Sequence, residues 1–296
     1  MAKRKNKKVT ANRNYKDTVF RKLFSDRRNL LSLYNAINGT AYTDETKLEI
    51  VTLENAIYMG MKNDLAFIID TNLFLYEHQS TYNPNMPLRD LFYISSEYQK
   101  LVDRKSLYSS ILLKLPAPNF IVFYNGKRKM PDRWTNCLSE SYENQQGDPN
   151  LELKVVTINI NRDCNRKLME QCRILGEYAQ YVEKVRENAE TMSLDTAVKE
   201  AVDECIQKGI LADFLRVNRA EVIAMSIFEY DKEEEEQKLQ ATYEKIGEKR
   251  GIQIGEKRGE LKKAKNIAIS LAQEGESIER IARILGETEK TIKEWL

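Results

Sequence analysis

The sequence predicts an α/β protein in which a mixed β-sheet flanked by helices is followed by an all-helical carboxyl-terminal part. Two short apolar stretches between Asn63 and Gln79 are joined by a polar pair, which predicts a β-hairpin. Asn119 to Tyr124 is a continuous apolar run, typical of a strand covered on both faces. From Cys164 onwards apolar residues recur at helical spacing, which predicts helices alone.

Composition restricts the class of protein. The chain has 296 residues, of which 42% are hydrophobic and 31% are charged, so it can bury a core and keep an ionic surface. No apolar run is long enough for a membrane span and no apolar segment follows the basic start, so we expect a cytoplasmic protein without a membrane partner. The four cysteines are scattered and there is one histidine, which argues against a zinc site and a disulfide framework.

Charge is distributed unevenly, although the net charge is only +2. Residues 1–50 carry twelve Lys and Arg against five Asp and Glu, a balance of +7. Residues 201–240 carry five against ten, a balance of −5. A basic amino-terminal part suits a polyanionic partner such as DNA, but the same residues also fit a tail that only keeps the chain soluble.

The first predicted elements are helices and a short strand. Apolar side chains at helical spacing indicate a helix within residues 15–25. Asp26 can cap a second helix, which Gly39 closes. Residues 48–53 have the pattern of a short strand before the hairpin, and Pro87 suits the first position of a long helix after it.

Later elements complete the sheet and then become helical. Residues 119–124 and 151–160 are predicted strands, and the polar segment 127–150 between them is predicted to be irregular. One helix is expected around residues 168–182 and another around 194–206, ending at Gly209. Short helices are expected near residues 211–215 and 222–228.

Glycines recur at every fourth position from Gly247 to Gly259. Each glycine costs a helix about 1 kcal/mol, so the segment is predicted to be a weak helix stabilised by self-association, or else a flexible linker. The last residues fit a helix-turn-helix, with Gly286 at the turn and with Ser277 and Thr288 as caps. Its final helix carries several glutamates, so a small packing or protein-contact module is as good an interpretation as a DNA reader.

These patterns divide the chain into five expected parts. They are a basic tail (1–13), an α/β domain (14–162), a helical extension packed on it (163–230), a charged glycine-repeat helix or linker (231–262) and a helix-turn-helix-like module (263–296). The glycine-repeat part is where we expect a homo-oligomer to form.

The hairpin carries the candidate site. With its turn centred on Thr71-Asn72, Asp64 is expected opposite Gln79, and Ala66 opposite Glu77. Side chains alternate between the faces of a strand, so Asp64, Glu77 and Gln79 are predicted to emerge on one face. The sequence therefore predicts an oxygen-rich cluster at the open end of an apolar hairpin.

Such a cluster suits a hard divalent cation. Asp64 and Glu77 would be a sufficient protein contribution to a Mg²⁺ site, and the backbone carbonyl of His78 could add a ligand. A metal held there could polarise a phosphodiester and ready a water for attack. Gln79 does not titrate, so it could orient water or a phosphate oxygen but not act as a base. The His78 side chain is expected to pack on the opposite face. The alternative for the cluster of Asp64, Glu77 and Gln79 is a solvated rim without function.

Several segments together resemble the Rpn family of recombination-promoting nucleases, also described as putative transposases, in the PD-(D/E)XK nuclease superfamily. They are Asn63-Asp64, Tyr76-Glu77-His78-Gln79-Ser80, Met86-Pro87-Leu88-Arg89, the helix Asp17-x-x-Phe20-Arg21-Lys22-Leu23-Phe24, Phe123-Tyr124-Asn125-Gly126, Leu175-Gly176-Glu177-Tyr178 and the glycine repeats. The resemblance covers residues 14–260. It implies a restriction-endonuclease-like core in residues 14–162, Mg²⁺-dependent DNA cleavage and a link to recombination or mobile DNA.

The resemblance also implies roles for single residues. Asp64 matches the superfamily's motif aspartate and Glu77 its second acid, while Gln79 stands where lysine is usual. Glutamine is the residue that the resembled family has at this position, so it does not by itself predict inactivity. It nevertheless removes the charged group that would activate water. Asp17 matches, by position only, an acid on the first helix that sometimes completes such sites.

Other residues are candidates for DNA contacts. Arg89 and Tyr93 lie one helical turn apart at the start of a helix and could contact phosphates, with packing and surface solvation as equal alternatives. Lys127, Arg128 and Lys129 could form a DNA-facing loop, and the alternative is a solvated loop. The rival function is a catalytically silent DNA-binding or self-assembling protein that uses the basic amino terminus and the helix-turn-helix.

Overall fold

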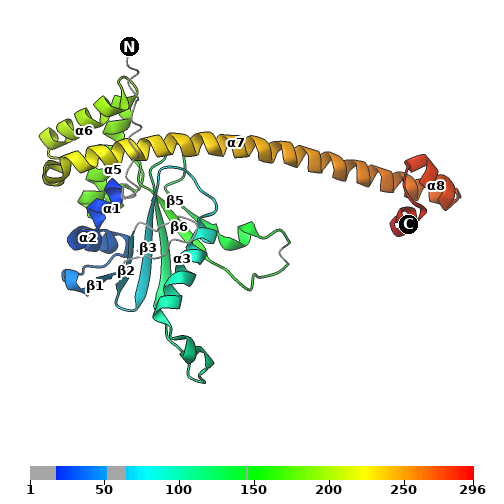
Figure 1. Ribbon diagram of the computed structural model, residues 1–296, viewed down its shortest axis with the longest axis horizontal. Coiled ribbons are helices and arrows are strands. Elements are labelled where there is room, and N and C mark those ends of the chain that lie inside the picture. The colour runs from blue at the N-terminus through cyan, green and yellow to red at the C-terminus, as the bar shows by residue number, and fades with distance from the viewer. Residues whose placement is uncertain (1–17, 52–64, 145) are drawn as a thin grey trace, which may run out of the picture. The chain divides into compact units, whose positions relative to one another are not determined.

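The computed structural model describes residues 18–51, 65–144 and 146–296 (Figure 1). These residues form two compact units that divide between Glu234 and Glu235, inside helix α7 (Ala212–Gln273). The second unit holds the rest of α7 with α8 (Ile278–Leu285) and α9 (Glu289–Trp295). No helix in the described part of the chain is long and apolar enough to cross a membrane.

The first unit is built on a six-stranded sheet, which is mixed as the sequence predicts. In spatial order its strands are β1 (Leu48–Ile50), β2 (Leu65–Ile69), β3 (Asn72–Gln79), β4 (Ala117–Tyr124), β6 (Lys154–Asn159) and β5 (Arg133–Cys137). The three central strands β3, β4 and β6 run parallel, and the outer pairings are antiparallel. The carboxyl ends of β3, β4 and β6 therefore meet at one edge of the sheet.

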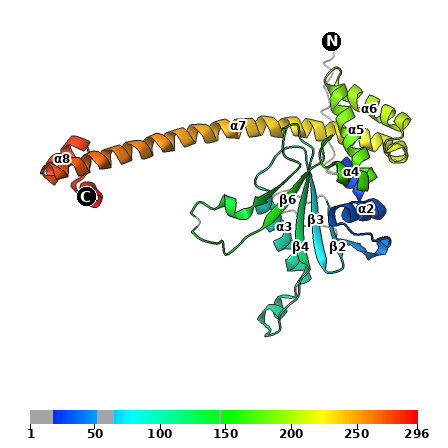
Figure 2. The same cartoon turned by 180° about the vertical axis from the view of Figure 1, so that it is seen from behind.

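Helices cover both faces of the sheet (Figures 1 and 2). On one side lies the larger core, formed with α1 (Val19–Phe24), α2 (Arg27–Asn38), α4 (Arg166–Gln171), α5 (Arg173–Ala189), α6 (Leu194–Lys208) and the start of α7. On the other side α3 (Met86–Leu101) packs over β3, β4 and β6 in a smaller core. Short 3₁₀ turns, η1 (Glu45–Lys47), η2 (Arg104–Tyr108) and η3 (Leu138–Ser141), connect elements.

The predicted helix boundaries are confirmed where capping residues define them. The Asp26 carboxylate accepts hydrogen bonds from two amide groups of the first turn of α2, at 2.9 Å and 3.1 Å. Gly39 ends α2 in a left-handed conformation with φ of 65°, which an L side chain would strain. Ser277 and Thr288 likewise cap α8 and α9, with Gly286 between them at a positive φ of 69°.

The predicted hairpin register is wrong by two residues. Ile69 pairs with Asn72, so the turn is Asp70-Thr71 rather than Thr71-Asn72, and Ala66 pairs with Leu75 rather than Glu77. Asp70 takes a positive φ of 52°, which aspartate tolerates better than most residues, and its carboxylate accepts a hydrogen bond from the Tyr42 hydroxyl at 2.7 Å. Because the shift is even, no side chain changes face.

Two further expectations need correction. Residues 133–137, in a segment predicted to be irregular, form the edge strand β5 against β6. The short helices expected near residues 211–215 and 222–228 are parts of the single helix α7, which is interrupted only by non-helical backbone angles at Asn218. The charged and glycine-repeat residues 231–262 continue the same helix, because glutamate, lysine and glutamine are good helix formers and no proline intervenes.

Gly126 allows a close approach at the carboxyl edge of the sheet. A Cβ atom there would clash with the backbone oxygen of Ser80 and with the Tyr124 hydroxyl. We therefore expect Gly126→Ala to lower the free energy of unfolding by about 1–3 kcal/mol, measured by urea denaturation.

The matched control is Gly247→Ala, because a Cβ atom at that helical glycine would meet nothing within 4 Å. This control should leave the first unit unchanged and stabilise the helix by about 1 kcal/mol. Equal stability of the Gly126→Ala variant and the wild type would contradict the crowding argument.

Candidate functional site

Glu77 lies near the carboxyl end of β3, the strand at the centre of the first unit. Its side chain lies on the face that α3 covers, in line with those of Leu73 and Leu75, and Glu77 pairs with Val122 of the neighbouring strand β4. Glu77 is only 4% exposed. Burying a carboxylate is costly unless a charge and hydrogen bonds compensate, so its partners determine what the site can do.

The principal partner is Arg89 in the first turns of α3. Its Nη2 lies 2.5 Å from the Glu77 carboxylate, with side-chain exposures of 20% and 6%, and also donates to the Tyr93 hydroxyl at 3.2 Å. Burial lowers the pKa of Arg89, but the negative charge of Glu77, together with Tyr93 and Asp90, outweighs burial and raises that pKa above its usual value. Burial and, to a smaller extent, the charge of Glu77 raise the pKa of Tyr93 to about 12. Tyr93 therefore keeps its proton at neutral pH.

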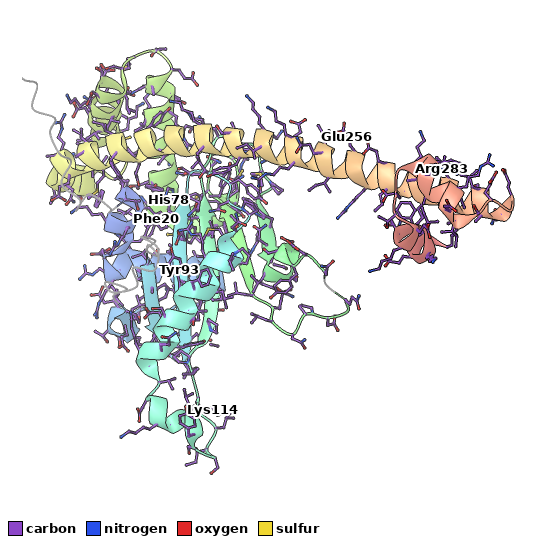
Figure 3. All side chains as sticks on the ribbon, turned by 45° about the vertical axis from the view of Figure 1, so that its right-hand side comes forward. Phe20, His78, Tyr93, Lys114, Glu256 and Arg283 are labelled. Carbon is purple, nitrogen blue, oxygen red and sulfur yellow. The ribbon has the colours of Figure 1, made fainter. Side chains whose placement is uncertain are left out.

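Gln79 and His78 lie on opposite faces of β3, as the sequence predicts. The Gln79 amide donates a hydrogen bond of 3.0 Å to the Glu77 carboxylate, so these two side chains meet on the α3 face. His78 stacks on Phe20 at 5.2 Å between ring centroids and lies 3.1 Å from the Tyr178 hydroxyl. Figure 3 shows Phe20 and His78 together, with Tyr93 separate on α3.

A second buried acid, Asp90, belongs to this cluster and was missed in the sequence. It is 2% exposed and sits on the face of α3 that also buries Tyr93 and Ile94. Burial raises the pKa of Asp90 well above its usual range, and the charge of Glu77 adds to that rise. The sequence signal for Asp90 is the occurrence of two acids, at positions 90 and 97, on the apolar face of this helix.

The donor set fits a hard divalent cation in its chemistry. Glu77, Gln79 and the His78 carbonyl carry oxygen atoms of the kind that such a cation prefers, and the carboxyl group of Asp90 lies near Glu77 and Arg89. Residues 18–51, 65–144 and 146–296 contain no group of three or more His, Cys, Asp or Glu that could hold a metal by themselves. The predicted ligand Asp64 and the predicted accessory acid Asp17 lie outside the described residues.

The predicted DNA contacts fall into two groups. Arg89 and Tyr93 are tied to Glu77 and largely buried, so they hold the acid in place. Lys127, Arg128 and Lys129 are exposed at the carboxyl edge. The Lys127 Nζ lies 4.8 Å from the ring centroid of Tyr230, and the Arg128 guanidinium lies over Tyr82.

The raised pKa of Asp90 has a consequence for stability. A carboxyl group whose pKa is higher in the folded than in the unfolded state stabilises folding less and less as pH rises above its unfolded value of about 4. We therefore expect Asp90→Asn to gain stability relative to wild type between pH 4.5 and pH 7.5, by at least about 1 kcal/mol. Urea denaturation at both pH values measures this, and the exposed Asp148→Asn is the control.

The Arg89–Glu77 pair gives a second prediction. Arg89→Met should lower the free energy of unfolding at pH 7 by about 3–5 kcal/mol, because it leaves a buried carboxylate uncompensated. Arg162 is a matched control, since its ion pair with Glu183 at 3.4 Å is largely exposed and Arg162→Met should cost less than about 1 kcal/mol. Equal losses in the two variants, measured by urea denaturation, would contradict the assignment.

Comparisons with known proteins add no functional information to the geometry of the Glu77 cluster. No protein-family model matches the chain, and no curated protein or solved structure matches it. The resemblance to the Rpn nucleases accordingly stays a hypothesis drawn from short motifs.

Proposed function

We propose that this protein is a metal-dependent DNA endonuclease that hydrolyses phosphodiester bonds at the Glu77 cluster. The observation that carries the proposal is the buried carboxylate of Glu77, held by Arg89 and Gln79 at the carboxyl edge of parallel strands. Ligands of open α/β sheets commonly bind outside that edge. The resemblance to the Rpn family, with its restriction-endonuclease-like core, supports the same reaction.

In this proposal Asp64 and Glu77 hold Mg²⁺, with the His78 carbonyl as a further ligand. Asp64 directly precedes Leu65, which pairs with Tyr76 next to Glu77. The bound metal would polarise the phosphoryl oxygen and ready the attacking water. Gln79 would orient that water or a phosphate oxygen through the amide that now contacts Glu77.

Arg89 acts in this proposal as a positioning residue. Its guanidinium forms an ion pair with the Glu77 carboxylate, and the Tyr93 hydroxyl accepts a hydrogen bond from the same guanidinium, so the two residues of α3 hold the acid in place. Lys127, Arg128 and Lys129 at the exposed carboxyl edge supply positive charge for the phosphate backbone of DNA.

Substitution of the two acids tests the activity. Asp64→Ala and Glu77→Gln should each lower Mg²⁺-dependent nicking of supercoiled plasmid by at least about 100-fold, because a metal supplies several kcal/mol of transition-state stabilisation. EDTA should abolish nicking by the wild type, and the exposed Glu140→Gln should cut normally. Circular dichroism checks that each variant is folded.

Unchanged nicking in both acid variants would overturn the proposal. DNA retention that survives EDTA, with no cleaved product from any variant, would instead favour the catalytically silent DNA-binding protein.

A second candidate function, self-assembly, is favoured by one face of α7. Five apolar side chains there, each between 39% and 64% exposed, are Leu239, Tyr243, Ile246, Ile254 and Leu261. At 100° per residue they fall within a sector of about 80°, so they form one stripe along the helix. The repeated Gly-Glu-Lys-Arg-Gly segments place charges of both signs beside it, which suits a second copy of the same chain.

The stripe predicts a dimer that one substitution weakens. Ile254→Glu should raise the dissociation constant at least about tenfold in sedimentation velocity, because association would bury an unpaired carboxylate. Ile252 is a matched control, since it is 54% exposed but lies on the opposite side of the helix. An Ile252→Glu variant that dissociates equally, or a wild type that stays monomeric, would contradict this interface.

A further inference from the structure

An aromatic surface lies on the same face of the sheet as Glu77. Glu77 pairs with Val122, Val122 with Thr157, and Thr157 with Trp134, so these four residues form one row across the sheet. Residues in one row point to the same face. Three strand spacings of about 4.8 Å place the backbone of Trp134 about 14 Å from that of Glu77.

Three rings from separate segments build this surface. The centroid of Trp134 lies 5.5 Å from that of Tyr124 at the end of β4, and 6.3 Å from that of Tyr82 in the loop after β3. The Trp134 Nε1 donates to Asn136 at 3.0 Å, which fixes the plane of the indole. Tyr82 and Trp134 are each partly exposed on the edge of the sheet, whereas Tyr124 is buried beneath them.

A cationic group lies over one of the rings. The Arg128 guanidinium lies 5.4 Å from the ring centroid of Tyr82, and the Tyr124 hydroxyl donates to the backbone oxygen of Arg128 at 2.9 Å. This hydrogen bond holds the backbone of Arg128 beside the aromatic surface, and the exposed residues Lys127 and Lys129 flank it in the chain. Aromatic rings for bases and positive charge for phosphates are the two components of a single-strand binding surface.

We propose that Tyr82 and Trp134 stack an unpaired nucleotide of single-stranded DNA while the same strand passes the Glu77 cluster. The inference rests on the proposed function, because it names the substrate class of that site as DNA with unpaired bases. A distance of about 14 Å corresponds to only a few nucleotides of a strand. Bases within a duplex already stack on each other and do not offer their faces to such rings.

A purely structural role for the rings makes a different prediction. If they only secure the edge strand β5, DNA should bind through charge alone, and duplex DNA should bind at least as tightly as single-stranded DNA because its charge density is higher. If they stack a base, single-stranded DNA should bind more tightly and its contact should change the indole environment. Each base stacked on an aromatic ring contributes enough to change affinity about tenfold or more.

Tryptophan fluorescence provides the first test. The chain has two tryptophans, so Trp295→Phe leaves Trp134 as the sole indole reporter. In EDTA, where no cleavage occurs, we expect saturable quenching by a thymidine 12-mer, at an affinity about tenfold higher than that for a 12-base-pair duplex. Absence of quenching, or equal affinity for the two DNAs, would overturn the inference.

Substitutions provide the second test, read by anisotropy of the labelled 12-mer in EDTA. Tyr82→Leu and Trp134→Leu should each weaken single-strand binding about tenfold and change duplex binding less than about twofold. Trp134→Phe keeps a ring and should retain most of the affinity. Tyr108→Leu, which removes a 93% exposed ring before β4, should change neither.

Circular dichroism shows whether the Trp134→Leu protein is folded. If it is misfolded, the loop variant Tyr82→Leu alone tests the stacking proposal. The two proposals fail separately, because these binding experiments need no metal and no cleavage. Single-strand preference without Mg²⁺-dependent cleavage of either single-stranded or plasmid DNA would leave the stacking surface standing and remove the nuclease. Metal-dependent nicking without single-strand preference, or without an effect of either leucine variant, would leave the nuclease standing and remove the stacking surface.

Discussion

The arrangement of the first unit depends on how the charge of Glu77 is compensated inside the sheet. A carboxylate that is 4% exposed is tolerated because Arg89 reaches it from α3 and Gln79 donates to it from the same strand. A buried ion pair contributes little net stability compared with apolar packing, but removal of one partner is costly because the other charge is left uncompensated. The packing of α3 on the sheet and the orientation of the acid are thereby coupled: one cannot move without exposing the other.

Parallel pairing determines which side chains share this environment. Because β3, β4 and β6 run in one direction, apolar side chains such as Leu75 and Phe120 fill the middle of the α3 face, and polar groups collect where the strands end. Glu77 and Gln79 belong to this polar end, and β5 adds Trp134 to the same row. The site and the aromatic surface are thus two parts of one edge, although Glu77 and Trp134 are 57 positions apart in the sequence.

Local patterns predicted much of the fold and the central part of the candidate site. Asp26 and Gly39 defined α2 because caps act within a few residues, and strict alternation placed Glu77 and Gln79 together even with the turn misplaced. Asp90 was not found because its burial comes from a sheet distant in sequence. Strand β5 was missed because an edge strand needs no apolar alternation, and its residues pair with β6 on one side only. The length of α7 was underestimated because its short apolar clusters suggested separate helices where the backbone continues.

The two-residue turn at Asp70-Thr71 also restricts how this gene region can change in length. A single codon inserted or deleted within β3 would exchange the faces of the strand beyond it, placing His78 under α3 and Glu77 in the aromatic core around Phe20. Changes that add or remove two residues would preserve the faces. Natural variants of this hairpin should therefore differ in length by even numbers within the strand, while the exposed segment after α3 is free to vary by any number.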